Sequence, residues 1–213
     1  MTMHKILKYI VIVLAVLAVI FFSLKFKNLE EYKTANTKET FDAKDYAQEF
    51  WDEKIPLAGE NAVEISEFLS LLKTTPDEAF NKFGHVLGIG KTHYFMLKGK
   101  GVIESVEVEF LSVKTDKNKP IKIATDFIFG NAVRDGSGLI SINEFLNMTD
   151  FNNVSVAINK LVKKNVVSKL KSAALPGMTI EFVGTTEIRK DNIDIKNIMI
   201  IPVATNWNKG KNN

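Results

Sequence analysis

The 213-residue chain contains no cysteine, which excludes disulfide bonds, thiolate metal sites, a cysteine nucleophile and a lipidated cysteine within this sequence. Arginine is scarce, since only Arg134 and Arg189 are found among the 28 basic residues. Excess positive charge is also missing from most of the chain. Residues 1–27 hold four lysines and no acidic residue, so they account for the net charge of +3. The remainder lacks the positive field that binds phosphates, and we expect no nucleic-acid partner.

One long apolar run is present, from Tyr9 through Leu14 and Phe21 to Leu24, with lysines on both sides. A helix rises about 1.5 Å per residue, so this run lies at the short end of what spans a hydrocarbon core of roughly 30 Å. We therefore expect residues 1–27 to be an N-terminal transmembrane anchor.

A cleaved export signal is the alternative to an anchor. Signal peptidase needs small residues at the third and first positions before the cut, and Val16-Leu17-Ala18 is the only candidate. Cleavage there would expose Val19 to Phe22 at a new N-terminus, so an uncleaved anchor is favoured.

Lysine counting alone would place the body in the cytoplasm, because more lysines follow the run than precede it. The short leader has no acidic residue, however, and we expect a single-pass inner-membrane protein whose body faces the periplasm.

The rest of the chain divides by composition into three parts. Residues 28–60 are polar and predict a stalk with a short helix near 42–53, which Pro56 is expected to end. Residues 61–205 predict a folded domain, and residues 206–213 predict a disordered tail.

Two short amphipathic helices are expected to open the domain. The first covers about 61–73 with Asn61 as its N-cap, and the second covers 76–83 with Gly84 as a left-handed stop. Alternating β-branched and aromatic residues then predict strands at Thr92–Lys98, Val102–Val113, Ile121–Phe129 and Leu139–Ile142. A helical stripe from Phe151 to Leu170 follows, and after it come strands at Met178–Ile188 and Ile198–Thr205.

Three or more strands, one helix and two more strands is the order of an OB-type barrel, which has a helix between its third and fourth strands. The predicted fold class is therefore α+β, an OB-like antiparallel β-barrel preceded by short helices and the N-terminal transmembrane helix. An open, strongly curved antiparallel sheet is the alternative that the pattern leaves open.

Familiar catalytic motifs are incomplete. Gly88-Ile-Gly-Lys-Thr92 resembles the end of a phosphate-binding loop, but His85 stands where its first glycine belongs, and the order of helix and strand is reversed. His85 and His93 have no further ligand at metal-binding spacing, and Ser137 lacks the pattern of a nucleophile elbow. We expect no cofactor, no metal and no enzymatic activity.

The densest polar cluster beside the predicted strands comprises Arg134, Asp135, Glu144 and Asn147. A guanidinium is a planar fork of donors that suits either a buried carboxylate partner or a bound anion. Structural pairing and ligand binding are therefore both open for these four residues.

Several segments resemble an uncharacterised bacterial family, the predicted periplasmic lipoproteins with domain of unknown function 2291. The central resemblance lies at Gly130–Asp135 and at Leu139–Phe145 with Asn147. Flanking resemblances are found at Ile55-Pro56, Phe83-Gly84, Tyr94–Val102, Gly177–Gly184 and Ile200–Val203. The chain departs from the family at its missing lipidated cysteine and at Leu146-Asn147-Met148, where the family tends towards Thr-Asn-Gln.

The resemblance implies an exported, membrane-tethered domain in a bacterium, and some members are encoded beside sugar-uptake systems. No catalytic residue comes with it. We expect a non-catalytic binding or accessory module outside the cytoplasm that serves a small solute or a membrane transport complex. The alternatives are a structural tether that docks on a membrane complex and, as a third hypothesis, a small hydrolase that uses the carboxylates of Asp135 and Glu144 beside Arg134.

Overall fold

The computed structural model describes residues 12–13, 16, 41–87 and 90–208. It separates the chain into two units, Met1–Phe41 and Asp42–Asn213, and the elements below belong to the second. The predicted anchor positions Tyr9, Leu14, Phe21 and Leu24 lie outside the described residues. Among the residues that are described, no helix combines the length and the apolar character needed to cross a membrane.

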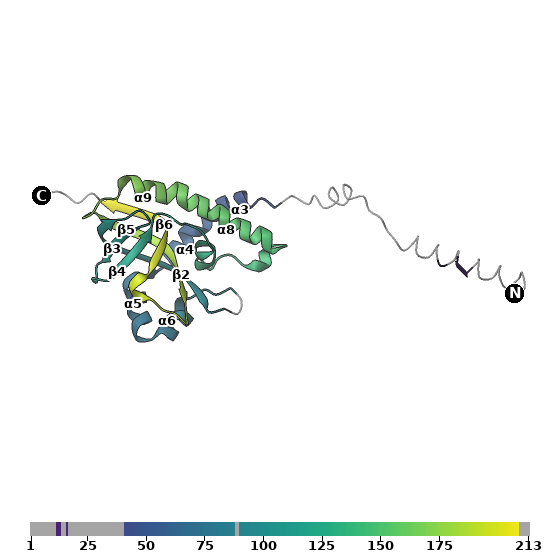
Figure 1. Cartoon of the computed structure of the whole chain (residues 1–213), viewed down its shortest axis with the longest axis horizontal. Helices are drawn as coiled ribbons and strands as arrows, with labels where there is room; N and C mark the ends of the chain where they lie inside the picture. Colours follow the sequence, from purple (N-terminus) through teal and green to yellow (C-terminus); the bar gives the residue numbers. More distant parts are fainter. Residues whose placement is uncertain (1–11, 14–15, 17–40, 88–89, 209–213) are drawn as a thin grey trace, which may run out of the picture. The chain divides into compact units, whose positions relative to one another are not determined.

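A closed five-stranded barrel forms the centre of the second unit (Figure 1). Its strands are β2 Thr92–Val106, β3 Phe110–Thr115, β4 Pro120–Ala124, β5 Thr179–Arg189 and β6 Met199–Asn208. They lie in the order β2-β3-β4-β6-β5, and β2 also pairs with β5, which closes the sheet. The pairing of β4 with β6 is parallel, and the other barrel pairings are antiparallel. The predicted OB-like barrel is thus confirmed, and the open-sheet alternative is not.

The first barrel strand is longer than predicted, because the chain turns at residues 107–109 and not at residues 99–101. Gly99 and Gly101 lie inside β2, where the backbone approaches its neighbours closely. An added Cβ at Gly99 would lie 2.5 Å from Ile65 Cγ2, and one at Gly101 would lie 2.6 Å from the Lys114 carbonyl oxygen. These glycines therefore permit close packing within a continuous strand and do not interrupt it.

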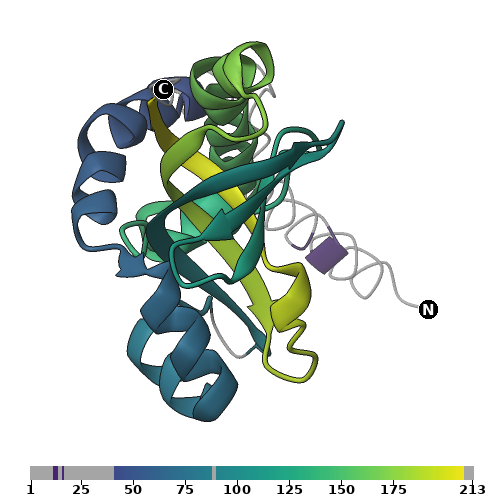
Figure 2. The ribbon, with the colours of Figure 1, turned by 90° about the vertical axis from the view of Figure 1, so that its left-hand side faces the viewer.

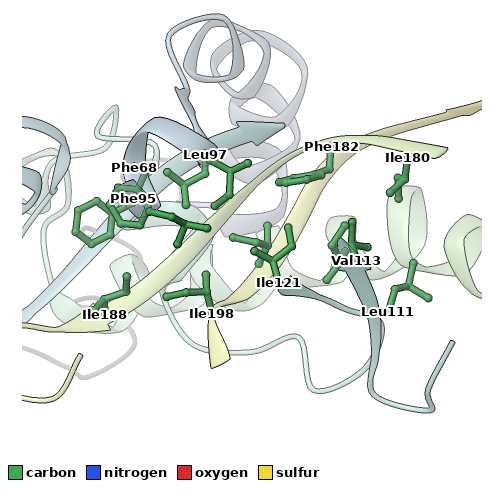
Figure 3. Packing of buried hydrophobic residues seen from close by; sticks show 14 of the residues in the cluster. Phe68, Phe95, Leu97, Leu111, Val113, Ile121, Ile180, Phe182, Ile188 and Ile198 are labelled. Carbon is green, nitrogen blue, oxygen red and sulfur yellow. The ribbon is translucent and has the colours of Figure 1, made fainter. Parts of the chain in front are cut away.

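The first hydrophobic core fills the barrel, where side chains from all five strands meet (Figure 3). Helices α5 Ile65–Thr74 and α6 Pro76–Phe83 cover one end of it. The ring centroids of Phe68 and Phe80 lie 4.7 and 5.6 Å from that of Phe95 on β2. Helix α6 has its predicted bounds.

The start of α5 and the role of Gly84 differ from the prediction. The two-residue strand β1 Val63–Glu64 pairs with β2 and precedes α5, so Asn61 ends the preceding helix and does not cap α5. Gly84 is extended, with φ of −86°, and is not left-handed. Glycine is needed at this position because there is no space for a side chain: an added Cβ would lie 2.5 Å from the Phe80 carbonyl oxygen.

A second core lies between the outside of the barrel and a layer of helices. The layer comprises α3 Ala43–Glu49, the π-helical turn η1 Phe50–Lys54, α4 Ile55–Glu60, α7 Ala132–Gly136, α8 Met148–Val162, the π-helical turn η3 Lys163–Val167 and α9 Ser168–Ala173. In Figure 1, α8 and α9 run in one continuous row along the barrel. The predicted helix between the third and fourth strands is therefore present, with a π-turn inside it.

Residues 42–60 belong to this compact unit, whereas we expected them in a polar stalk. Ala47, Phe50 and Ile55 are buried in the second core, although charged residues surround them in the sequence, and α3 packs against α8. The helix also continues beyond Pro56. The proline falls in the first turn of α4, immediately after the π-turn.

The predicted strand over residues 121–129 ends at Ala124. The backbone N–H groups of Thr125 and Asp126 both donate to the carbonyl oxygen of Glu109, and the chain then leaves the sheet. Phe127 and Phe129, which lie at the end of the predicted strand, are 61% and 68% exposed.

Two further predictions were wrong, one for residues 139–142 and one for residues 206–208. Residues 139–142 form no strand, since Ser141 caps the 3-10 turn η2 Ile142–Glu144 through a capping box. Residues 206–208, expected in a disordered tail, belong to β6 and pair with β5, whereas residues 209–213 lie outside the described part.

Candidate functional site

Arg134 and Asp135 lie on α7 and are almost fully buried, with 1% and 8% of their surfaces exposed. Arg134 Nε donates to Asp135 Oδ1 at 2.6 Å, and Nη2 donates to Oδ2 at 3.1 Å. Nη1 donates to the Phe151 carbonyl oxygen at 2.9 Å, and the guanidinium lies 3.4 Å from the centre of the Phe151 ring. Hydrogen bonds on each side compensate for the desolvation of the two charges. The pair therefore joins α7 to α8.

Glu144 has different partners. Its Oε1 accepts from the Ser141 backbone N–H at 2.7 Å, and its Oε2 accepts from the Tyr46 hydroxyl at 2.8 Å. Partial burial raises the pKa of Glu144, but these two hydrogen bonds outweigh it and hold the pKa below its ordinary value. Burial, followed by the hydrogen bond to Glu144, raises the pKa of Tyr46. Glu144 thus connects η2 to α3 as an ionised carboxylate.

Asn147 is the N-cap of α8. Its Oδ1 accepts from the Asp150 backbone N–H at 2.9 Å, and its Nδ2 donates to Asp150 Oδ2 at 2.8 Å. The structure therefore brings Arg134 and Asp135 together and gives Glu144 and Asn147 separate capping partners. Ligand binding by these four residues stays a prediction.

A pocket of about 540 Å³ opens beside α7, between α4, the end of α6, β2 and the segment after α7. Apolar side chains lining it include Leu57, Val63, Met96 and Leu139. Polar side chains lining it are those of Asn61, Lys82, His85 and Ser137. No carboxylate belongs to the described residues that line this pocket. A mixed lining of this kind is typical of sites for small ligands.

His85 is held in the pocket wall by its backbone and by its ring. Its N–H and carbonyl groups exchange hydrogen bonds of 2.8 Å with Tyr94. Its imidazole packs on Gly138, which has φ of +67° and where an added Cβ would collide with the ring. Partial burial lowers the pKa of His85, so the imidazole is neutral at pH 7. A neutral imidazole offers one donor and one acceptor.

The turn at Ser137 forms another part of the pocket wall. The Ser137 hydroxyl donates to the Arg134 carbonyl oxygen at 2.7 Å and accepts from the Leu139 backbone N–H at 3.1 Å. These bonds fix the turn that carries Gly138 against His85. The same two hydrogen bonds occupy the Ser137 hydroxyl. The serine and His85 therefore do not form a nucleophile–base pair.

Lys82 lies at the edge of the pocket. Its Nζ is 3.5 Å from Glu67 Oε1 and 4.6 Å from the centre of the Phe83 ring. Both charged side chains of this pair are about half exposed, so the pair is weak and the ammonium can turn to a ligand.

From the sequence, we considered His85 and Ser137 separately, and no pattern indicated that they line the same pocket. The one local signal was the run Asp135-Gly-Ser-Gly138, because glycines on both sides of a serine permit a close approach of other groups. The other residues considered have structural partners. The His93 ring lies edge-on to Phe80 at 4.8 Å, and Lys91 pairs with Asp191 at 3.2 Å. Within the described part of the chain, no group of three His, Asp or Glu residues could hold a metal ion.

Comparison with known proteins agrees with this architecture. A crystal structure of an OB-fold protein from Thermotoga maritima MSB8 is similar, with a TM-score of 0.72 and 28% sequence identity. The likeness covers 80% of this chain and 100% of that one. No curated protein matches. Residues 14–206 match the family described as "Predicted periplasmic lipoprotein (DUF2291)". This match confirms the resemblance noted in the sequence, and the chain belongs to the DUF2291 family of predicted periplasmic lipoproteins.

Proposed function

We propose that this protein is a non-catalytic binding module that holds a small neutral or anionic solute in the pocket beside His85. The observation that carries the proposal is the pocket itself, about 540 Å³ with an apolar wall and a few convergent polar groups. One part of its wall is the turn at Ser137, whose hydroxyl donates to the backbone carbonyl oxygen of Arg134.

The lining favours one class of solute. His85 offers a donor and an acceptor, Asn61 offers an amide, and Lys82 supplies a positive charge at the edge. A cationic solute would find no carboxylate among the described lining residues. Leu57, Met96 and Phe83 provide surface for C–H groups. A sugar, which alternates C–H and O–H groups, fits this chemistry, and a link to sugar uptake is the finer form of the proposal.

A non-catalytic role is favoured over hydrolysis. General acid–base catalysis requires groups that reach the substrate. Asp135 is buried and engaged by Arg134, Glu144 accepts from two protein donors, and the Ser137 hydroxyl is occupied. Each of these groups would have to lose a protein partner before it could act on a substrate.

The module is proposed to be tethered at the inner membrane with its body in the periplasm. The apolar run Tyr9–Leu24 supports a single-pass anchor, and the family description supports the compartment. A lipid anchor through cysteine has no acceptor within these 213 residues.

The test measures the melting temperature of the full chain with pools of sugars, nucleosides and peptides. A solute at a hundred times its Kd stabilises the folded state by about 2.7 kcal/mol, which raises the melting temperature by several degrees. Leu57→Trp places a larger side chain at the pocket wall from an exposed position and is expected to abolish the shift. The matched control Leu175→Trp, at an exposed leucine that does not line this pocket, keeps the shift. No shift with any pool, or an undiminished shift in Leu57→Trp, contradicts the proposal.

A second candidate, a structural tether that docks on a membrane complex, is favoured by the segment before α8. Leu146 is 94% exposed, and Met148 beside it is about half exposed. A photo-reactive residue at position 146 should capture one specific membrane protein in intact cells. Capture of none would remove this candidate.

A further inference from the structure

The lysines of the chain's second half are concentrated on one helical row. From Phe151 to Ile180 the sequence contains five lysines and no acidic residue, whereas the chain beyond residue 27 is close to neutral. These residues are Lys160, Lys163, Lys164, Lys169 and Lys171, and all five are exposed on α8, η3 and α9. The row therefore carries an unbalanced positive charge.

Only the last of these lysines has a carboxylate partner in the described part of the chain. Lys171 Nζ lies 3.8 Å from Asp126 Oδ2, and the other four form no ion pair with a described carboxylate. Four ammonium groups thus remain available to an anionic partner.

An aromatic loop runs beside this row of lysines. Asp126 is held at Lys171, and the Gly130 carbonyl oxygen accepts from Asn159 Nδ2 at 2.9 Å, so residues 126–130 follow the helix from α9 back to α8. Ile128 is buried under the loop, while Phe127 and Phe129 point away from the core and are mostly exposed. Phe127 has φ of +48°, a conformation that costs free energy for any residue with a side chain. The fold thus presents two aromatic rings next to the lysines.

A pocket of about 320 Å³ lies between the loop and α8, with Phe129, Val156, Lys160 and Lys163 among its lining residues. Ser155 also lines it, is 5% exposed, and its hydroxyl has no hydrogen-bond partner among the described residues. A helical serine usually donates to the carbonyl four residues earlier. Here that carbonyl, on Phe151, already accepts from Arg134 Nη1. The pocket is therefore lined by a hydroxyl without a described partner and by two lysine side chains.

We propose that this face, defined by Phe127, Phe129, Val156 and the lysines at 160, 163 and 164, docks on an anionic phospholipid surface. Aromatic and aliphatic side chains flanked by lysines without acidic residues are the composition of surfaces that lie in a membrane interface. The phosphates pair with the lysines, the rings enter the headgroup region, and a headgroup oxygen reaches Ser155. This role goes beyond solute binding, because none of these residues lines the pocket beside His85.

The absence of cysteine makes a direct test practical. Val156→Cys in the full chain carries an environment-sensitive fluorophore, and the protein is reconstituted in vesicles of phosphatidylcholine with or without phosphatidylglycerol. We expect the fluorophore to enter an apolar environment only in the anionic vesicles and to leave it at high salt. A fluorophore at Asn81→Cys, on α6, is the control. Figures 1 and 2 both place α6 at the end of the barrel away from α8 and α9, so its signal should not change.

Charge variants provide the second part of the test. Each lysine near an anionic surface contributes roughly fivefold to binding, so Lys160→Gln, Lys163→Gln and Lys164→Gln together should lower the ratio of docked to undocked protein on the order of a hundredfold. The matched variant Lys114→Gln, Lys117→Gln and Lys119→Gln, on β3 and its turn, should leave the ratio unchanged. Equal signals in neutral and anionic vesicles, or equal losses in the two charge variants, overturn the proposal.

Discussion

Arg134 holds Phe151 in two ways, because its Nη1 donates to the Phe151 carbonyl oxygen at 2.9 Å and its guanidinium lies 3.4 Å from the centre of the Phe151 ring. The same guanidinium is hydrogen-bonded to Asp135 on its own helix. This arrangement connects the short helix α7 to the start of α8. The backbone carbonyl oxygen of Arg134 accepts from the hydroxyl of Ser137, whose turn forms one wall of the solute pocket.

Arg134→Met should destabilise the fold by about 3–5 kcal/mol, because it leaves the Asp135 carboxylate buried without its partner. The double variant Arg134→Met with Asp135→Leu should lose less than Arg134→Met alone, since no uncompensated charge remains. Urea unfolding of the three proteins measures both values. If Arg134→Met alone is as stable as the wild type, the structural role of the pair is contradicted.

Gly138→Ala should destabilise the fold by about 2 kcal/mol or more, since φ is +67° and the new methyl group meets the His85 ring. Gly130→Ala is the matched control. It has φ of +79° with open space around its Cβ position, so only the backbone cost of about 1 kcal/mol is expected. Denaturant midpoints compare the two variants. Equal losses would show that the ring of His85 does not pack on Gly138.

The stability of the protein should fall as the pH is lowered through the titration of His85. Burial lowers the pKa of His85 in the folded state, so the unfolded state binds a proton more readily. The stabilising contribution of the neutral ring is complete above the unfolded pKa of about 6.5, decreases below it, and is lost once the pH falls below the folded pKa. The urea midpoints of the wild type and of His85→Gln are measured as a function of pH. The difference between the two midpoints isolates the contribution of His85. A difference that does not vary with pH would contradict it.

Phe127→Gly should stabilise the fold by about 0.5–1 kcal/mol, because glycine adopts φ of +48° without strain and the Phe127 ring is mostly exposed. The same change should weaken docking on anionic vesicles. Phe129→Gly is the control. Phe129 is not among the residues with positive φ, so its replacement by glycine should destabilise the fold. Thermal unfolding compares the two proteins, and a loss of stability in Phe127→Gly would count against a strained loop.

The barrel could be predicted from sequence because its strands alternate clearly, as Ile121 and Ile123 do against Lys122. Where the prediction was wrong, long-range packing overrode the local pattern. We expected separate strands at Thr92–Lys98 and Val102–Val113, but Gly99 and Gly101 permit close packing inside one continuous strand, β2. Ala47 and Phe50 lie among charged residues, and only their packing in the second core shows that they are buried.

The candidate pocket could not be predicted, because its walls come from distant parts of the chain. Leu57, His85 and Leu139 belong to segments whose proximity follows from the closure of the barrel and the packing of α4 and α7 on it. Sequence did single out Arg134 and Asp135 as a candidate pair, and the structure brings their side chains together. The neighbouring Glu144 and Asn147 have local capping roles that spacing alone did not distinguish from ligand binding.

Solute binding beside His85 is tested most directly by following the histidine ring resonances by NMR while each solute pool is added. The chain has three histidines, which makes their signals separable. We predict that an active pool shifts the His85 signals and leaves those of His93, packed against Phe80, unchanged. A pool that raises the melting temperature without moving the His85 signals would contradict binding at this pocket.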